Sequence, residues 1–212
     1  MKNNLIISFC LVISLLTACG GGSNTAAPKP AAVQAGDYAL TPYSGMAGMQ
    51  KAVKVGAQEN IEEEGDLLNG QREGTWATYH KGVKSHLLES VTNYRNGVKH
   101  GLFLVMDDRG NITEKGFYVN GNLEGRVFVY DRGRISEETD YKNGQIDGER
   151  KRYYSNLQLQ EAGTFKNGKR DGYARWYDQD GNVTIEYQYK NGEKIGQNTA
   201  TGTKPAKEEG GK

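Results

Sequence analysis

Two arginines and a tryptophan are the residues of this 212-residue chain best suited to binding chemistry. Arg150 and Arg152 occupy positions that are mostly apolar in the neighbouring repeats of the sequence, and Trp176 follows in the next repeat. A guanidinium pairs with carboxylate or phosphate, and a Trp ring supplies a large apolar area. Because a break in a sequence's own pattern is a candidate functional site, we predict that these three residues form part of a partner-binding face. The alternative is that this column of side chains faces water throughout.

Catalytic and metal-binding residues do not form comparable patterns. The three histidines, His80, His86 and His100, lack the spacing of metal ligands and have no cysteines near them. The sequence contains no nucleophile elbow, phosphate loop or H-E-x-x-H motif. We therefore predict a protein that is not an enzyme and that uses no cofactor and no metal. The acidic run at 62–64 is either a recognition patch or, as is more usual for charge runs, a solvated face.

The charge balance argues against one class of partner. The chain carries 27 Lys and Arg against 26 Asp and Glu, a formal net charge of +1. Proteins that bind nucleic acid generally present an excess of basic residues to the phosphates. We therefore expect no nucleic-acid partner.

The elements that would position the binding residues recur along the sequence. Asn-Gly-x-x-x-Gly appears six times, at residues 69–74, 96–101, 120–125, 143–148, 167–172 and 191–196. A fixed period in this range is typical of a repeat architecture, and Asn-Gly favours the tight turn of a β-hairpin. The sequence therefore predicts an all-β fold of consecutive hairpins, each of which buries its face by stacking on its neighbours.

The strand that leads into each Asn shows a two-residue period. A large side chain lies two residues before the Asn, and a mostly small one lies four residues before it. Because alternate residues share a face of a strand, we expect the aromatic residues to form a ladder that stacks from repeat to repeat while the small residues make room for it. The ladder residues are Tyr94, Tyr118, Tyr141, Phe165 and Tyr189.

The N-terminus has the pattern of an exported lipoprotein. Lys2 precedes an apolar run at 5–16, and Leu16-Thr17-Ala18-Cys19 follows at once. A charged start, a short apolar run and small residues at the cleavage site indicate a secretory signal peptide, and the ending resembles a bacterial lipobox. We expect Cys19 to be lipidated and to anchor the chain to a membrane through its acyl chains. The alternative is an ordinary signal peptide with an incidental cysteine.

Composition divides the chain into five segments. Residues 1–18 are the expected signal peptide, and 19–36 are the lipidated Cys19 with a flexible tether rich in Gly, Ala and Pro. Residues 37–60 form an N-terminal cap of uncertain structure, in which 49–55 are either a short helix or an edge strand. Residues 61–196 form the repeat domain, and 197–212 resemble a disordered tail.

The repeats resemble a known family. Asn-Gly-x-x-[Asp/Glu]-Gly, followed by an aromatic strand, an Asp/Asn-Gly turn and a Tyr before the next Asn-Gly, is similar to the bacterial variant of the MORN repeat. The resemblance covers about residues 61–196 and departs from the pattern at His100 and Ile195, where an acidic residue is usual. It implies a single-layer, twisted antiparallel sheet of consecutive MORN-type hairpins. It also implies binding roles, which include YwqK-type immunity partners of toxin–antitoxin systems and membrane-associated scaffolds.

Three functional classes follow from these observations. The first is a membrane-anchored, non-catalytic scaffold that binds a protein partner, such as an immunity or antitoxin-like module. The second is a structural or self-assembling envelope lipoprotein that associates through exposed sheet edges, and the third is a hydrolase of envelope polymers. In each case we expect the bacterial cell envelope. The resemblance to bacterial lipoproteins implies that Gly20, directly after the lipidated cysteine, favours sorting to the outer membrane.

Overall fold

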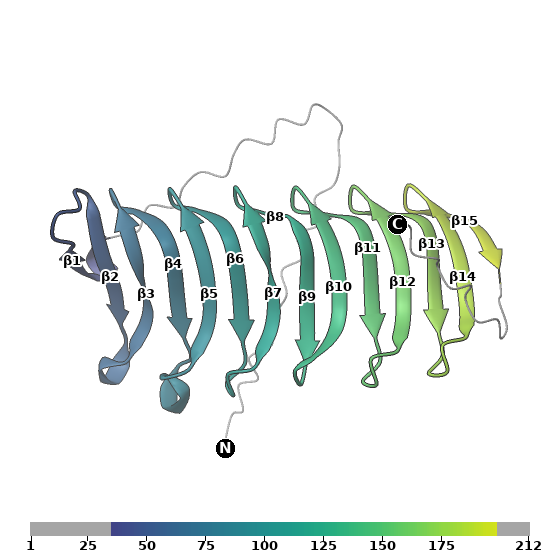
Figure 1. The fold of residues 1–212 in the computed structure, drawn as a ribbon, viewed down its shortest axis with the longest axis horizontal. Helices are drawn as coiled ribbons and strands as arrows, with labels where there is room; N and C mark the ends of the chain where they lie inside the picture. The colour runs from purple at the N-terminus through teal and green to yellow at the C-terminus, as the bar shows by residue number, and fades with distance from the viewer. Residues whose placement is uncertain (1–34, 199–212) are drawn as a thin grey trace, which may run out of the picture.

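The chain folds as one open β-sheet. The structure, a computed structural model, describes residues 35–198, which contain a sheet of 15 strands. Figure 1 shows the strands side by side in chain order. They are β1 (Ala39–Pro42), β2 (Met49–Val55), β3 (Ile61–Leu68), β4 (Gln71–Tyr79), β5 (Leu88–Arg95), β6 (Val98–Met106), β7 (Ile112–Val119), β8 (Asn122–Leu123), β9 (Gly125–Asp131), β10 (Arg134–Lys142), β11 (Gln145–Tyr153), β12 (Leu159–Lys166), β13 (Lys169–Tyr177), β14 (Val183–Lys190) and β15 (Glu193–Asn198).

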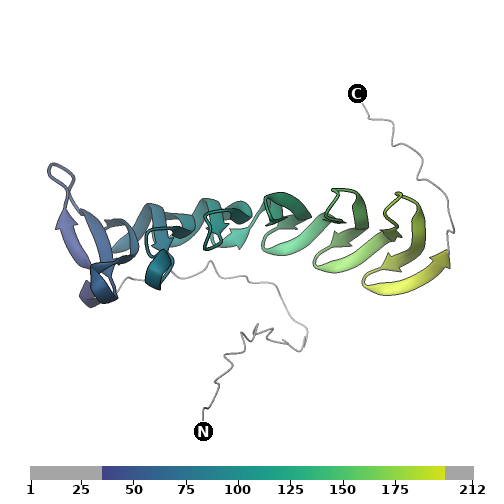
Figure 2. The same cartoon turned by 90° about the horizontal axis from the view of Figure 1, so that it is seen from below.

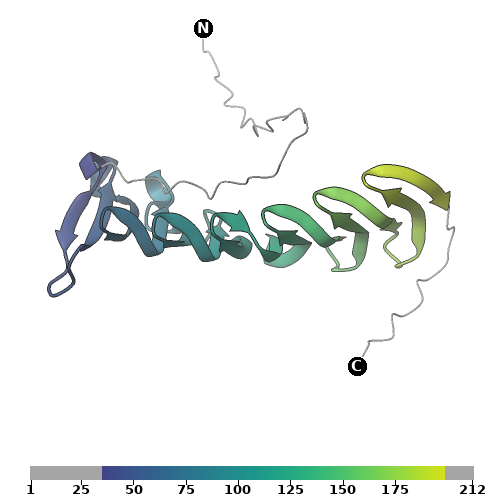
Figure 3. The same ribbon diagram turned by 90° about the horizontal axis from the view of Figure 1, so that it is seen from above.

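All strand pairs are antiparallel, and nearly all join strands that follow one another in the chain. The exception is at the two-residue β8, which pairs only with β7, so that β7 also pairs with β9 and the sheet continues from there. Figures 2 and 3 show that the strands are bent and that the sheet twists along its length. The prediction of an all-β, single-layer, twisted antiparallel sheet is confirmed. Three short 3-10 segments, η1 (Ala35–Asp37), η2 (Ala57–Glu59) and η3 (Gly82–Lys84), are the helical parts of the described residues, and none is long and apolar enough to cross a membrane.

The Asn-Gly pairs form the turns that close six of the hairpins. The φ angles of the six Asn residues lie between 49° and 52°, and those of the six following Gly residues between 76° and 91°. Positive φ at both central residues defines the type I′ turn, whose twist matches that of the flanking strands. Asn and Gly adopt this left-handed backbone at the lowest cost. The local sequence therefore sets these turns.

The fifth residue of the motif ties each turn to the next one. The Glu73 carboxylate accepts a hydrogen bond from the backbone N–H of Asn96 at 2.8 Å. His100 stands in place of the acid in the second copy, and its Nδ1 accepts from the N–H of Asn120 at 3.4 Å. The later copies again use a carboxylate, in the pairs Glu124–Asn143, Asp147–Asn167 and Asp171–Asn191. These contacts hold successive turns in line along one edge of the molecule.

One face of the sheet carries a row of buried side chains. Residues that pair directly across strands share a face. We call this row the central row, and the face that bears it the inner face; Ala52, Trp76, Phe103, Val127 and Ala174 in it are at most 5% exposed. In strand order the central row is Ala52, Gly65, Trp76, Thr92, Phe103, Gly116, Val127, Thr139, Arg150, Gly163, Ala174 and Tyr187.

Small residues in the central row make room for their large neighbours on the adjoining strand. A Cβ atom on Gly65 would lie 2.3 Å from the Trp76 ring, and one on Gly116 would lie 2.8 Å from both Phe103 and Val127. Glycine is needed at these two positions because the neighbouring side chain lies directly over its Cα atom. The small column of the sequence therefore serves the central row.

The aromatic ladder differs from the prediction. Its members, Tyr94, Tyr118, Tyr141, Phe165 and Tyr189, are half-buried on the inner face, but within residues 35–198 no ring contact joins one member to the next. Successive members lie two strands apart, about 10 Å. The strand between them carries the fourth residue of the motif opposite one member and the second glycine opposite the next, as Arg170 and Gly172 do between Phe165 and Tyr189. The expected stacking from repeat to repeat is therefore wrong. The rings pack within their own units instead, in the pairs Trp76–Tyr94, Phe103–Tyr118 and Tyr187–Tyr189.

The sheet extends beyond the segment 61–196. Within 37–60, residues 39–42 and 49–55 are strands β1 and β2, and β1, not β2, is the edge strand. At the other end, Gln197 and Asn198 belong to β15, so these two residues are not part of a disordered tail. The expected signal peptide, Cys19 and almost all of the tether and tail lie outside the described residues.

Candidate functional site: the inner face of the sheet

The structure places Arg150, Arg152 and Trp176 on the inner face. Arg150 lies in the central row, opposite the buried Thr139. The alternative that its column faces water throughout is wrong, because Trp76 and Phe103 are buried in the same column. Arg152 and Trp176 lie in the adjoining row of the same face. This second row consists of Glu63, Thr78, Ser90, Val105, Glu114, Val129, Glu137, Arg152, Glu161, Trp176 and Ile185.

Glu137 binds both arginines. Arg150 donates two hydrogen bonds of 3.0 Å to the two carboxylate oxygens, and Arg152 Nε donates to one of them at 2.9 Å. Burial opposes ionisation of Glu137, but the hydrogen bonds from the two arginines outweigh it and lower the pKa of this carboxyl. The Arg152 side chain is still 46% exposed, so this guanidinium remains within reach of a partner.

Trp176 belongs to a cluster at the C-terminal end of the inner face. Arg170 Nη2 donates to Glu161 at 2.5 Å, and Arg152 Nη1 lies 3.6 Å from the same carboxylate. Glu161 thus connects the Trp176 cluster to the Glu137 network, and the three predicted residues lie in one continuous set of contacts. The Arg170 guanidinium carbon lies 5.2 to 5.6 Å from the centres of three rings, those of Phe165, Trp176 and Tyr189.

A matching cluster lies at the N-terminal end of the inner face. The Arg72 guanidinium carbon lies 4.1 Å from the centre of the Trp76 ring and 5.2 Å from that of Tyr94, and Arg72 Nη1 lies 2.7 Å from Glu63. The Tyr38 hydroxyl donates to Glu63 and accepts from Arg72 at 3.2 Å. Burial, aided by the hydrogen bond to Glu63, raises the pKa of Tyr38 to about 12.

Neither Arg72, Arg170 nor Glu161 was expected from the sequence to take part in the site, and Glu63 stood out only as part of the acidic run at 62–64. Arg72 and Arg170 are the fourth residues of their Asn-Gly motifs, and Glu63 and Glu161 precede the respective motifs by six residues. The signal was available, because the fourth position is Arg or Lys in four of the six copies. The link between the fourth residue and its acid can be recognised only when the strand pairing within each hairpin is known.

The other residue groups singled out in the sequence are distributed through the fold. In the acidic run, Glu63 faces Arg72 on the inner face, whereas Glu64 pairs with Lys51 at 2.9 Å on the opposite face. The run is therefore not one recognition patch. Among residues 35–198 no group of three or more His, Cys, Asp or Glu side chains is placed to hold a metal ion.

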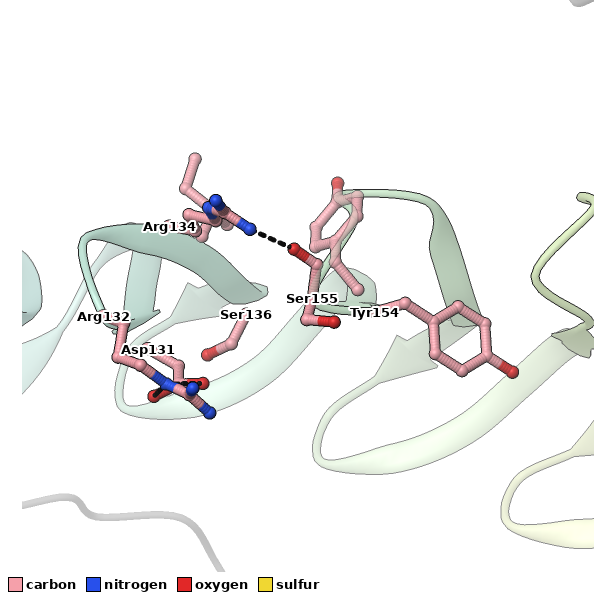
Figure 4. Close-up of a pocket in the computed structure, with 8 residues that line it drawn as sticks. Asp131, Arg132, Arg134, Ser136, Tyr154 and Ser155 are labelled. Atoms are coloured by element: carbon pink, nitrogen blue, oxygen red, sulfur yellow. Dashed lines mark hydrogen bonds and ion pairs between the residues drawn. The ribbon is translucent and has the colours of Figure 1, made fainter.

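A small hollow lies at the ends of two hairpins, away from the central row. It has a volume of about 220 Å3 and includes Asp131, Arg134 and Ser155 in its lining. Figure 4 shows Arg134 reaching across it, where Nη1 donates to the Ser155 carbonyl at 2.7 Å. The adjacent Tyr154 extends towards the next hairpin, where its hydroxyl donates to the carbonyl of Tyr177. Both contacts tie neighbouring hairpin ends together.

Two segments of the chain match the model of a known repeat family. The chain has no match among curated proteins. A family model described as a MORN repeat variant matches residues 146–167 and 170–191. Each match begins at the fourth residue of an Asn-Gly motif and ends at the Asn of the next. The segments 146–167 and 170–191, which contain Arg150, Arg152, Arg170 and Trp176, are therefore MORN-type repeats.

Proposed function

We propose that this chain is a membrane-anchored, non-catalytic scaffold that binds a protein partner through the inner face of its sheet. The observation that carries the proposal is the continuous face itself. It presents Arg152, Trp176 and a series of half-buried tyrosines on a single-layer sheet that no second layer covers within the described residues. Tyr, Trp and Arg are the residues most enriched in the energetic centres of protein interfaces.

In this proposal the acyl chains of the lipidated Cys19 anchor the protein in the bacterial envelope, at the outer membrane. The lipobox-like ending of the apolar run supports it, and the MORN-type repeats are compatible with a binding role at a membrane. An immunity or antitoxin-like module is the form of this function that the resemblance favours.

Site-specific photo-crosslinking in intact cells tests the proposal. The crosslinking residue replaces Val129 on the inner face in one variant and Phe117 on the opposite face in the other; these side chains are 37% and 53% exposed. We expect one protein partner to be captured from position 129 and not from position 117. Capture from both positions alike, or from neither, would contradict a binding role of the inner face.

The arginines give the second arm of this experiment. Arg152→Ser, in the 129 variant, should reduce capture while the melting temperature changes little, because this side chain is partly exposed. Arg132→Ser is the matched control, since Arg132 lies in a turn and is 87% exposed. Loss of capture that accompanies unfolding would not count in favour of the site.

A second candidate function rests on the open ends of the sheet. Within the described residues β1 and β15 each pair on one side only, and an unpaired strand edge is a template for another chain. A structural lipoprotein that assembles end to end would use these edges. Sedimentation of the full chain at increasing concentration distinguishes this function, because only the assembling form grows with concentration.

A further inference from the structure

The repeats allow one unit of the inner face to be compared with another. In each hairpin, the residue two before the Asn pairs directly with the fourth residue of the motif, as Phe165 does with Arg170. This residue is Leu67 in the first hairpin and a ladder residue in the other five. The second-row residue of the same hairpin lies on the same face, nine residues before that fourth residue. The six resulting pairs are Glu63–Arg72, Ser90–Lys99, Glu114–Leu123, Glu137–Ile146, Glu161–Arg170 and Ile185–Lys194.

Two of these pairs hold a guanidinium in the same way. Arg72 and Arg170 lie 2.7 and 2.5 Å from the carboxylates of Glu63 and Glu161. Both guanidiniums also lie over aromatic rings of the ladder and of the neighbouring rows. The unit therefore forms a seat in which a carboxylate and aromatic rings together bind a cation.

The third hairpin keeps the acid of this seat and lacks the cation. Leu123 stands where the other hairpins have Arg72 and Arg170, and within residues 35–198 the Glu114 side chain has no hydrogen bond and no ion pair. The fourth hairpin also lacks the cation, because it has Ile146, but Arg150 and Arg152 pair with its Glu137 instead. The other two hairpins have no acid in this position.

The surroundings of Glu114 are those of a cation seat. Its direct neighbours in the second row are Val105 and Val129, which supply no charge. The Lys99 ammonium lies 4.9 Å from the centre of the Tyr118 ring, at one side of the seat, and makes no ion pair with Glu114 within the described residues. Burial raises the pKa of Glu114, as expected for a carboxylate that has lost water without gaining a partner. Burial also raises the pKa of Tyr118 and of Tyr141, and in each the Glu114 charge adds to the increase, so both ladder tyrosines lie within its field.

We propose that Glu114, together with Tyr118 and Tyr141, receives an arginine side chain of the protein partner, in the position that Arg72 and Arg170 occupy in their own hairpins. This inference rests on the proposed function and adds the chemistry of the partner at one place on the inner face. A guanidinium would complete the ion pair that Glu114 lacks and would lie against the tyrosine rings. The site accordingly selects a basic segment over an acidic one.

The first test uses N-acetyl-arginine amide as the probe, with N-acetyl-citrulline amide as the uncharged control of nearly the same shape. NMR of the full chain follows the Glu114 carboxyl carbon and the Tyr118 and Tyr141 rings. We expect saturable shifts of these signals with the arginine probe, and at least about tenfold weaker binding of the citrulline probe, since a hydrogen bond to a charged group is lost. Equal binding of both probes would overturn the proposal.

Two variants place the probe at this carboxylate. Glu114→Gln should weaken binding of the arginine probe about tenfold or more, and Leu123→Arg should abolish it by filling the seat from within. Glu89→Gln, an exposed acid on β5 whose side chain faces away from the inner face, is the matched control and should bind as the unchanged chain does. Unchanged binding by Glu114→Gln would refute the site even if Leu123→Arg failed to fold.

The crosslinking experiment separates this inference from the proposed function. Capture of a partner from position 129 that persists in Glu114→Gln and in Leu123→Arg would leave the inner face as the binding face and refute the arginine seat. If Glu114→Gln and Leu123→Arg both reduce capture while Glu89→Gln does not, the result would support both the inner face as the binding face and the arginine seat. Absence of capture from position 129 in the unchanged background would contradict the proposed function, whereas the NMR titration would still decide the seat.

Discussion

Between β3 and β9 the central row carries Trp76, Phe103 and Val127, whereas between β10 and β13 it carries Thr139, Arg150 and Ala174. Both halves have the same Asn-Gly turns and the same alternation of strands. In the central row, therefore, the N-terminal half is filled by large apolar side chains, whereas the C-terminal half includes Arg150 and its ion pair with Glu137. The same repeat backbone accommodates either apolar or charged side chains in this row, because the turns rather than the core set its geometry.

The largest expected effect separates the two tryptophans. Trp76 is 2% exposed and packs against Ala52 and Leu67, so Trp76→Ala should lower the free energy of unfolding by about 3–5 kcal/mol. Trp176 is half-buried, and Trp176→Ala should cost about 1–2 kcal/mol. Urea unfolding followed by far-ultraviolet circular dichroism measures both. Equal losses would mean that the two halves do not differ in how they are stabilised.

The glycines of the central row give the next largest difference. Ala at Gly65 would bring a Cβ within 2.3 Å of the buried Trp76 ring. Ala at Gly163 would first meet Arg170 Nη1, the end of a flexible side chain, at 3.0 Å. We expect Gly65→Ala to cost about 1–3 kcal/mol by overpacking, and Gly163→Ala clearly less. Comparable melting temperatures for the two variants would show that the central row is packed as tightly at Gly163 as at Gly65.

Much of this fold was predictable because its signals are local. Asn-Gly specifies a type I′ turn from two residues, and the two-residue period specifies which side chains share a face. The hairpins and their antiparallel order therefore followed from the sequence, as did the common face of Arg150, Arg152 and Trp176. The stacking of Tyr94 on Tyr118 did not occur, because the distance between alternate strands is a property of the sheet that no single repeat shows.

The candidate site was less predictable for a related reason. Arg150 stood out because it breaks a column, but Arg72 and Arg170 obey the motif and gave no such signal. Their role depends on Glu63 and Glu161, which become neighbours only through the hairpin register. Glu114 was harder still to find, because its distinguishing feature is a missing cation at Leu123. An absence of this kind becomes visible only after the same pair has been seen in other hairpins.

Two second-row acids, one from each half, should respond to pH in opposite directions. The pKa of Glu137, in the C-terminal half, is lowered in the folded state, so its contribution to stability is present at neutral pH and is lost as the pH falls through the folded pKa. The pKa of Glu114, in the N-terminal half, is raised. Its ionisation therefore favours the unfolded chain, and stability is lost as the pH rises through the folded pKa.

Glutamine at each position checks these signs. At pH 7, Glu137→Gln should lower the stability by about 1–2 kcal/mol, because two arginines lose a charged acceptor, and Glu114→Gln should raise the melting temperature slightly. Below the ordinary pKa of glutamate both differences should shrink towards zero. Melting temperatures of the three proteins between pH 3 and pH 7 provide the measurement. A decrease for Glu114→Gln at neutral pH would show that its carboxylate has a partner.

The smallest expected effect tests whether the halves differ only in their cores. His100, in the N-terminal half, is a weak acceptor for the Asn120 N–H at 3.4 Å, whereas Glu73 and Glu124 in the flanking motifs accept at 2.8 Å. A carboxylate makes a stronger, charge-assisted hydrogen bond, so His100→Glu should stabilise the protein by about 0.5 kcal/mol. Ile195→Glu is the control, because within the described residues no turn follows β15. A similar gain in both variants would assign the effect to surface charge, whereas a gain at His100 alone would show that the turns form one series along both halves.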